Sequence, residues 1–210
     1  LNIPQFEIPG FEADDLIGTI NRTVESLDKE LLTLILTGDK DMFQLVDNDT
    51  HVYMPGRGKF QQDKEYDIEA VKEKMGVTPE QVPDLKGLMG DSSDNIPGVK
   101  GIGPKTASAL IQAFDTIEGV YEALEKDDPN PVFTPSVKKK LTTDKKIALI
   151  SKELATIVVD APIDFVLKNC TVASYSKQEV TDLFLELGFN SLIKSLPQDS
   201  FETDIQEALF

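Results

Sequence analysis

Residues 90–111 read GDSSDNIPGVKGIGPKTASALI, a glycine-rich turn that leads into an apolar helix. Pro104 suits the first position of that helix, because the N–H that proline lacks would have no partner there. Gly101 and Gly103 flank Ile102, an apolar side chain that we expect to anchor the turn in the core, while the glycines allow another group to approach the backbone closely. The stretch therefore predicts a tight turn whose backbone is open to a ligand at a helix start.

The start of this helix has the properties of an anion site. Free N–H groups and the positive end of the helix dipole favour an anion there, and Lys105 and Thr106 add a cation and a hydroxyl. A nucleic-acid phosphate fits such a site and carries no base identity. The glycine spacing is neither that of the Walker loop nor that of the Rossmann fingerprint. A simple helix–turn–helix with a tight loop and no ligand is the alternative.

Seven acidic side chains occur in three short clusters along the chain. They are Glu12, Asp14 and Asp15, then Asp39 and Asp41, then Asp91 and Asp94. Carboxylates gathered in one place repel one another unless cations lie between them. Hard cations such as Mg²⁺ and Mn²⁺ prefer carboxylate oxygens. We therefore expect the three clusters to meet at a site for divalent metal ions.

The positions of these clusters favour convergence, but each cluster also has a simpler explanation. Asp39 and Asp41 follow the strongest predicted strand, and ligands collect at the carboxyl ends of strands in open parallel sheets. Asp14 and Asp15 open a helix, where acids also complement the helix dipole. The segments around Asp39 and Asp91 are rich in turn formers that need no metal. The conjunction of the three groups favours the metal interpretation.

Apolar periodicity predicts an α/β fold for the first half of the chain. Helices and strands alternate there, which favours a layered structure with a mostly parallel sheet. The predicted elements are a helix over 13–27, a buried strand over 31–37, a short helix over 41–45, a strand over 51–54, and helices over 67–75 and 79–89.

The strand signal fades after Gly90, and the second half is predicted to be helical. The predicted helices span 105–114, 117–126, 136–141, 144–154, 177–187 and 191–196, and three prolines interrupt the helical pattern between the second and third of them. We therefore expect a helical subdomain over 91–196 and a tail or linker over 197–210.

The 210-residue chain is acidic, with a formal net charge of −16. Such a charge argues against simple electrostatic attraction to nucleic acid. Lysines nevertheless concentrate between Lys138 and Lys152, where a solvated helix face and a DNA contact are equally good explanations. Bound cations would also neutralise part of the acidic clusters. The average charge therefore does not exclude a nucleic-acid partner.

Other chemistries find little support in the sequence. His51 is the only histidine and Cys170 the only cysteine, so no Cys/His zinc spacing, Ser-His-Asp set or internal disulfide exists. His51 falls in an expected strand and is interpreted as structural. No secretory signal pattern or membrane-length apolar run is present, so a cytoplasmic protein is expected. If the site hydrolyses a substrate, the nucleophile would be a water activated by two ions about 4 Å apart.

Three segments carry a resemblance to a known family: EADD (12–15), TGDKD (37–41) and GDSSDNIPGVKGIGPKTA (90–107). They resemble the motifs of the 5′ nuclease (flap endonuclease) family, most closely those of the 5′–3′ exonuclease domain of bacterial DNA polymerase I. The likeness runs from Phe11 to about Leu196 and includes the closing LFLELGFNSLIKSL (183–196). These motifs are long, ordered and specific.

The resemblance implies a fold, an activity and a set of metal ligands. Residues 1–90 would be the C-terminal portion of a PIN-like nuclease core, and 91–196 a helix–three-turn–helix DNA-binding subdomain. The family cleaves DNA at 5′ ends and flaps in replication and repair. The implied ligands of two Mg²⁺ or Mn²⁺ ions are Glu12, Asp14, Asp15, Asp39, Asp41, Asp91 and Asp94. The implied catalytic residues are Asp14, Asp15, Asp39 and Asp41.

The resemblance also implies roles for the glycine turn. The residues expected to contact duplex DNA are Gly101, Gly103, Lys105 and Thr106. A K⁺ ion between protein and duplex phosphate would be held by the main-chain carbonyls of Gly98, Val99 and Ile102.

The chain departs from the family at its beginning. Family members start with a strand that bears a metal-binding Asp, then a second Asp and a basic arch, and none of these precedes Leu1. We therefore expect an N-terminally truncated, monomeric fragment of a bacterial nuclease, weak or inactive by itself, whose parent chain could also contain a polymerase region.

Two other functions stay open at this point. The first is a non-catalytic duplex-DNA-binding module that keeps the glycine turn but does not cut. The second is a PIN-type ribonuclease, which would explain the acidic clusters but would not need the turn for duplex phosphate.

Overall fold

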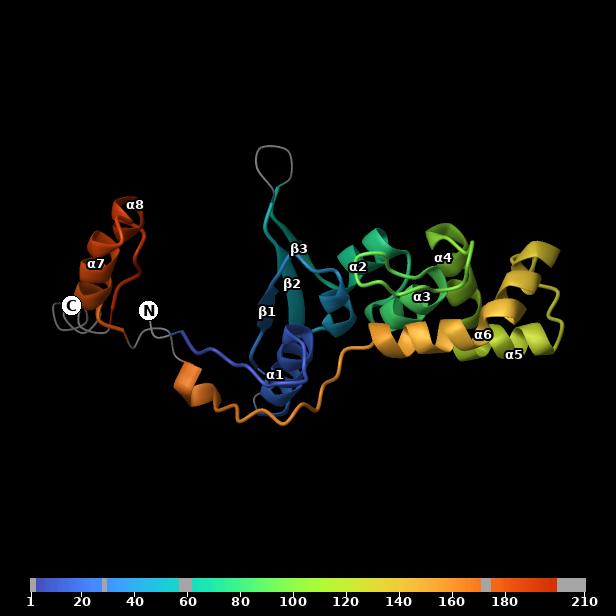
Figure 1. The fold of residues 1–210 in the computed structure, drawn as a ribbon, viewed down its shortest axis with the longest axis horizontal. Helices are drawn as coiled ribbons and strands as arrows, with labels where there is room; N and C mark the ends of the chain where they lie inside the picture. Colours follow the sequence, from blue (N-terminus) through green and yellow to red (C-terminus); the bar gives the residue numbers. More distant parts are fainter. Residues whose placement is uncertain (1–2, 28–29, 57–61, 171–174, 200–210) are drawn as a thin grey trace. The chain divides into compact units, whose positions relative to one another are not determined.

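The computed structural model describes residues 3–27, 30–56, 62–170 and 175–199 of the chain. The chain forms two compact units. The larger is Ile8–Ile163, and the smaller combines Leu1–Glu7 with Asp164–Phe210. All seven acidic residues and the glycine turn belong to the larger unit, which contains a sheet and a set of helices (Figure 1).

The sheet of the larger unit has three strands in the order β1-β2-β3. The parallel pair is β1 (Thr33–Leu36) and β2 (Thr50–Met54), and β3 (Lys64–Tyr66) runs antiparallel to β2. The sequence predicted β1 and β2 but not the short β3, whose three residues have no clear apolar alternation. Helix α1 (Ala13–Leu27) and the short helix η1 (Asp41–Leu45) have the predicted bounds, and each contacts the sheet.

The prediction that 31–37 forms a fully buried strand is wrong in one respect. Ile35 is buried, but Leu34 and Leu36 are 51% and 70% exposed. Side chains alternate between the two faces of a strand. Only the Ile35 face of β1 packs on the core, and within the described residues nothing covers the opposite face.

The core of the larger unit is continuous from the sheet into the helices. Met42 and Phe43 of η1 are fully buried, and the Phe43 ring lies 4.6 Å from the ring of Tyr66 on β3. The same cluster continues through Val71, in α2 (Ile68–Met75), to the helices that follow. The part of the larger unit that contains the sheet (the sheet half) and the part made of the helices after α2 (the helical half) therefore share one core.

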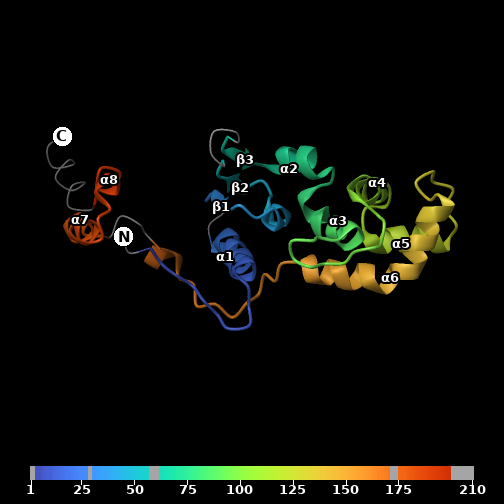
Figure 2. The same ribbon diagram turned by 45° about the horizontal axis from the view of Figure 1, so that its top comes forward.

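Helix α3 (Val82–Met89) is the centre of the helical half and follows the short η2 (Pro79–Gln81). Its neighbours are α4 (Pro104–Phe114), α5 (Ile117–Glu125) and α6 (Pro135–Ala155), which pack around it (Figure 2). A Cβ on Gly87 would lie 2.5 Å from Ile117 and 2.9 Å from Lys152, so only glycine permits this close packing.

Helix bounds follow local capping. Asp67 caps α2 by accepting from the Ala70 N–H at 2.8 Å, and Gly76 ends that helix with φ +77°. Two helices were expected over 136–141 and 144–154. The structure has one helix, α6, with non-helical backbone angles at Asp144 (φ −109°, ψ 18°). The sequence therefore placed the interruption at 142–143, just before its observed position at Asp144, and overestimated its length.

A buried ion pair joins α3 to α6. Asp84 is 4% exposed, and its carboxylate lies 2.7 Å from the Lys152 ammonium. The same carboxylate accepts from the Ile117 N–H at 2.8 Å, at the start of α5. Lys152 also pairs with Glu118 at 2.8 Å. One buried carboxylate thus ties three helices together.

The smaller unit contains η3 (Leu167–Cys170), α7 (Lys177–Glu186) and α8 (Asn190–Ile193). Ser176 caps α7 through the Glu179 N–H. The final helix is shorter than the predicted 191–196, and most of the predicted tail, residues 200–210, lies outside the described residues. Within the described ranges, every helix is too short or too polar to cross a lipid bilayer.

We expect Lys152→Met to lower the free energy of unfolding by about 3 kcal/mol, because the Asp84 carboxylate would stay buried without its cation. Urea unfolding followed by circular dichroism measures the change. Lys146→Met removes the same charge from an exposed position of α6 and should change stability by less than about 0.5 kcal/mol. Equal losses for the two variants would contradict the structural role of the pair.

Candidate metal centre and phosphate-binding turn

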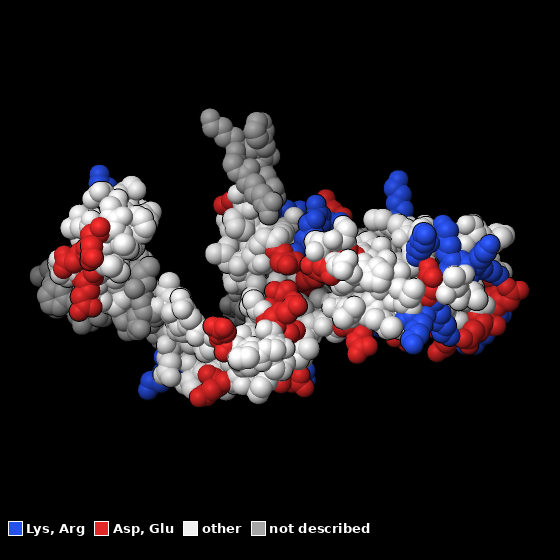
Figure 3. Space-filling model, in the orientation of Figure 1, with Lys and Arg blue, Asp and Glu red and all other residues white. Residues whose placement is uncertain are grey.

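The three acidic clusters lie together in the larger unit. Six of the seven carboxylates line a cavity of about 480 Å³, namely Glu12, Asp14, Asp15, Asp39, Asp41 and Asp94. A second cavity of about 430 Å³ is lined by Asp91 together with three acids of the first, Asp39, Asp41 and Asp94. Figure 3 shows acidic side chains gathered where the sheet half meets the helical half. The expected convergence is therefore observed.

Local structure positions each cluster. Asp14 and Asp15 lie in the first turn of α1, and Asp39 and Asp41 lie between β1 and η1. The Asp41 N–H donates to Asp39 at 2.9 Å, which orders the short turn after the strand. The end of β1 and the start of α1 thus deliver four acids to one cavity.

The third cluster is held by a closed loop. Asp91 and Ile96 form an isolated antiparallel bridge, with backbone hydrogen bonds of 2.9 and 2.8 Å. Asp91 accepts from the Ser93 N–H at 2.9 Å, and Asn95 adopts a left-handed backbone with φ 59°. These contacts aim Asp91 and Asp94 back toward η1.

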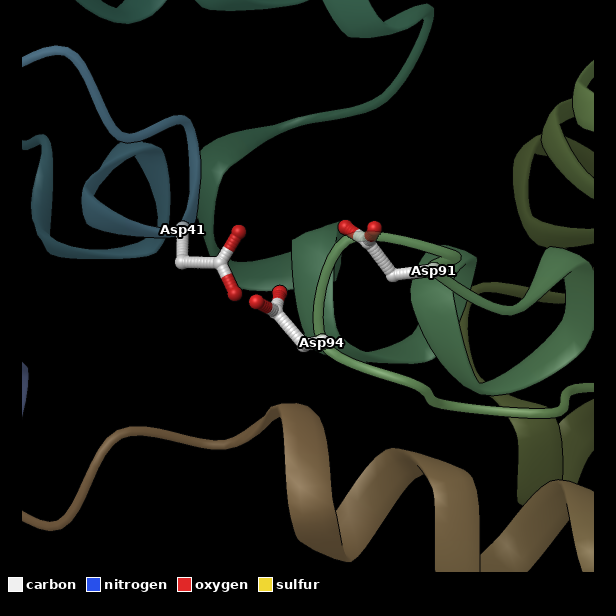
Figure 4. A group of neighbouring side chains, drawn as sticks. All are labelled: Asp41, Asp91 and Asp94. Atoms are coloured by element: carbon white, nitrogen blue, oxygen red, sulfur yellow. The ribbon is translucent and has the colours of Figure 1, made fainter.

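Asp41, Asp91 and Asp94 each offer a carboxylate oxygen within 4.8 Å of the others. In Figure 4, Asp41 enters from one side of the space and Asp91 and Asp94 from the loop opposite. Oxygen atoms at this separation suit a divalent cation with hard-ligand preference. The donor set therefore fits Mg²⁺ or Mn²⁺ in chemistry.

Lys86 is a site residue that the sequence reasoning missed. It is 2% exposed on α3, forms an ion pair with Asp41, and lies 2.7 Å from Asp91 and 3.8 Å from Asp94. A signal existed, because a lysine inside the apolar helix 79–89 must find an anionic partner. The lysine places a positive charge among carboxylates that would otherwise repel one another.

The electrostatic environment differs between the two ends of the site. Burial raises the pKa of the Asp14 carboxyl, and the nearby charges of Asp39 and Glu12 raise it further. Burial alone would also raise the pKa of Asp91, but hydrogen bonds from Lys86 and Ser93 outweigh it and lower that pKa to about 2. Among the described residues, no lysine or arginine pairs with Asp14 as Lys86 pairs with Asp91.

Asp15 differs from the other predicted metal ligands. One of its carboxylate oxygens accepts from the Val158 N–H at 2.9 Å, and the other accepts from the Glu12 N–H at 3.1 Å. Both oxygens therefore already bind backbone groups. The contacts connect the start of α1 to the segment that follows α6.

The glycine turn has the predicted form. Ile102 is 3% exposed and anchors it in the core, and α4 begins at Pro104. Gly101 has φ +81°, which favours glycine. A Cβ on Gly103 would have no atom within 4 Å, so the space at the helix start is open.

The turn is joined directly to the third acidic cluster. A Cβ on Gly98 would lie 2.2 Å from the Gly90 nitrogen, so two glycine backbones pack in contact immediately before Asp91. The Val99 N–H donates to the Leu88 carbonyl at 2.8 Å. The turn therefore packs directly against the start of the loop that carries Asp91 and Asp94.

Two family models cover residues 1–178 of the chain. Residues 1–76 match the "5'-3' exonuclease, N-terminal resolvase-like domain", and residues 77–178 match the "5'-3' exonuclease, C-terminal SAM fold". The chain belongs to the 5′–3′ exonuclease family. This is a family of nucleases, and the family assignment made from the sequence motifs is confirmed.

DNA polymerases I are among the relatives of this chain. The enzyme of Bacillus subtilis (strain 168) is 42% identical over 207 residues, covering 99% of this chain and 23% of the relative. That of Caldicellulosiruptor bescii is 40% identical over 197 residues, covering 93% of this chain and 22% of the relative. The chain thus spans less than a quarter of the length of these relatives.

Several solved structures share the fold of this chain. Bacteriophage T5 5′-exonuclease with bound zinc has a TM-score of 0.61 and 25% identity, over 74% of this chain and 53% of that chain. The T5 flap endonuclease complex with DNA and metal ions has a TM-score of 0.60 and 25% identity, over 72% and 52%. The Rad2 catalytic core has a TM-score of 0.52 at 18% identity, over 83% and 57%. The α/β fold with a following helical domain is confirmed.

We expect Lys86→Met to lower the thermal midpoint in EDTA, because Asp41 and Asp91 would lose their cation, at a cost of about 3 kcal/mol. Added MnCl₂ should recover more of this loss in the variant than it adds to the wild type, since the ion supplies the missing charge. Differential scanning calorimetry measures both effects. Lys105→Met, at an exposed position, is the control, and equal behaviour of the two variants would contradict the role of Lys86.

The low pKa of Asp91 predicts a pH dependence of stability. Its folded pKa of about 2 lies below the ordinary 3.8, so the stabilisation is present above about pH 4 and lost as the pH falls toward about 2. The contribution is roughly 2 kcal/mol. Urea unfolding between these pH values should therefore show a smaller acid loss in Lys86→Met than in the wild type. Parallel curves for the two proteins would refute this coupling.

Proposed function

We propose that this chain carries the metal-dependent centre and the duplex-binding turn of a 5′–3′ exonuclease or 5′-flap endonuclease that hydrolyses DNA phosphodiesters in replication and repair. One observation supports this most strongly. Three acidic clusters from separate parts of the sequence line adjoining cavities, and the open glycine turn packs against the loop that carries one of them. Under this proposal, a cutting site and a phosphate-binding site lie in one unit.

The acids would divide the metal-binding work between them. Under this proposal the residues that hold two Mg²⁺ or Mn²⁺ ions, directly or through water, are Glu12, Asp14, Asp15, Asp39, Asp41, Asp91 and Asp94. The catalytic residues would be Asp14, Asp15, Asp39 and Asp41. Divalent ions at such a site supply an activated water and stabilise the leaving oxygen. Asp15 would also orient α1, because each of its oxygens accepts one backbone N–H group.

Lys86 would contribute at the end of the site where Asp91 lies. Lys86 neutralises Asp41 and Asp91 within a buried setting, so it keeps these oxygens close together. Burial, and after it the nearby charges of Asp39 and Glu12, raises the pKa of Asp14, so the charged carboxylate is disfavoured at this end. Bound cations would therefore contribute most there.

The glycine turn would bind duplex phosphate without reading bases. The contacts proposed are Gly101, Gly103, Lys105 and Thr106. The open space at Gly103 and the exposed Lys105 side chain support a phosphate at the start of α4. A K⁺ ion at the carbonyls of Gly98, Val99 and Ile102 is part of the proposal.

Known relatives support the choice of substrate. The T5 flap endonuclease was solved with DNA and metal ions, and the Rad2 core with DNA substrate. The curated relatives are DNA polymerases I. We therefore propose DNA with a 5′ end or flap as the substrate, and a polymerase region in the same parent chain.

Cleavage of labelled 5′-flap DNA, linear duplex and single-stranded RNA by this chain tests the proposal. We expect Mg²⁺- or Mn²⁺-dependent cleavage of the flap at a low rate, lost in EDTA, with the RNA left intact. The double variant Asp39→Asn with Asp41→Asn should abolish cleavage and retain duplex binding. Asp49→Asn with Glu80→Gln makes the same charge change at exposed positions and should keep the activity.

The same experiment separates the alternatives. Duplex binding without cutting of any substrate under either metal would favour a non-catalytic binding module. Cleavage of RNA in preference to the flap would favour a ribonuclease. Retained flap cleavage in the Asp39 and Asp41 double variant would contradict the proposed centre.

A further inference from the structure

Three polar side chains of α6 contact the backbone of the glycine turn. The Lys140 ammonium donates to the Gly101 carbonyl at 2.8 Å. The Asp144 carboxylate accepts from the Lys100 N–H at 3.0 Å, and the Ser151 hydroxyl accepts from the Gly98 N–H at 3.1 Å. All three contacts join a side chain to backbone 39 to 53 residues away.

The three side chains come from one helix, α6. Lys140 and Ser151 lie on either side of the irregular residue Asp144, and all three side chains reach the backbone of residues 98–101. We call these three side chains the α6 clamp.

Each contact has a property that a random surface contact would lack. Ser151 is fully buried, so its hydroxyl and the Gly98 N–H are held together away from water. Asp144 is the one residue of α6 with non-helical backbone angles, and it is the residue that accepts from Lys100. The helix is therefore irregular at the point where it meets the turn.

Lys140 differs from its neighbours on α6. Its stem covers Gly101 so closely that a Cβ there would lie 3.0 Å from the ammonium and 3.2 Å from Cε. Lys138 instead pairs with Asp127, and Lys145 with Glu125 at 2.8 Å. Lys140 thus places its charge on a carbonyl of the turn that would otherwise repel a phosphate.

The same helix reaches the acidic site. Leu154 and Ala155, in its last turn, line the acidic cavity. Ser151 fixes Gly98, whose backbone packs on Gly90 directly before Asp91. A single helix therefore contacts both the turn and the wall of the cavity.

We propose that Lys140, Asp144 and Ser151 are positioning residues that hold the glycine turn in the conformation that binds duplex phosphate, with Lys140 supplying a fixed positive charge at the Gly101 carbonyl. This rests on the proposed function for its DNA-binding part. The clamp itself is a property of the free chain. It acts on backbone groups, so it is independent of the sequence of the DNA.

Two readouts test the clamp. The first is amide hydrogen exchange of Gly98 and Lys100 by NMR without DNA. The second is the Kd for a labelled 5′-flap duplex in EDTA. The variants are Lys140→Met, Asp144→Ala and Ser151→Ala, with Lys140→Arg and Asp144→Asn as conservative rescues, and Lys139→Met and Lys146→Met as matched charge controls.

We expect Asp144→Ala to expose the Lys100 amide to exchange and Ser151→Ala to expose that of Gly98. Lys140→Met and Asp144→Ala should each raise the duplex Kd about tenfold, a loss of 1.4 kcal/mol in binding. Lys140→Arg and Asp144→Asn should stay within about twofold of the wild type, since arginine donates and the asparagine oxygen accepts. The control variants should raise the duplex Kd only about twofold, because they remove one positive charge and no contact with the turn.

Several results would overturn the clamp. One is a Kd for Lys140→Met no higher than that for Lys139→Met. Another is Asp144→Asn behaving as Asp144→Ala. Fast exchange of Gly98 and Lys100 in the wild type would also overturn it. A wild-type chain that binds no duplex, but whose amides are protected, would instead reject the proposed function, and with it the DNA-binding role of the clamp.

Discussion

Mutual repulsion among carboxylates is the constraint on which the rest of this structure depends. Acids that repel one another in water are held around adjoining cavities, and the fold has to supply positive charge to keep them there. It does so with Lys86, buried on the central helix α3 and paired with Asp41 and Asp91. No such cation lies against Asp14 among the described residues, and the pKa of Asp14 is raised by burial and its neighbours. The protein itself therefore supplies a cation at one end of the site, where Lys86 lies.

The helical half of the larger unit holds the irregular glycine turn next to the acids. Gly87 lets α3 and α6 approach closely, and Gly90 and Gly98 let two backbones pack in contact. The turn has few side chains with which to hold itself, because glycine carries none. Long-range side-chain contacts from α6 supply the missing support. Rigidity at the turn is thus contributed by a neighbouring helix.

Much of the fold could be predicted from the sequence, because helix bounds depend on nearby residues. Asp67 and Gly76 delimit α2, and Pro104 opens α4, as their local chemistry requires. Predictions that needed tertiary context did less well. The strand β3 lacks a local signal, and the exposed face of β1 follows from what packs on the sheet rather than from its apolar sequence.

The sequence by itself determined the kinds of groups available: carboxylates at the ends of elements, and a glycine turn that opens a helix. These are read from residues close together in the chain. Only the tertiary structure decided that Lys86 lies between the acids, that Asp15 binds the Val158 backbone, and that α6 contacts the turn. Those partners are up to 143 residues apart in sequence, and no local pattern records which distant segments the packing of a core will bring into contact.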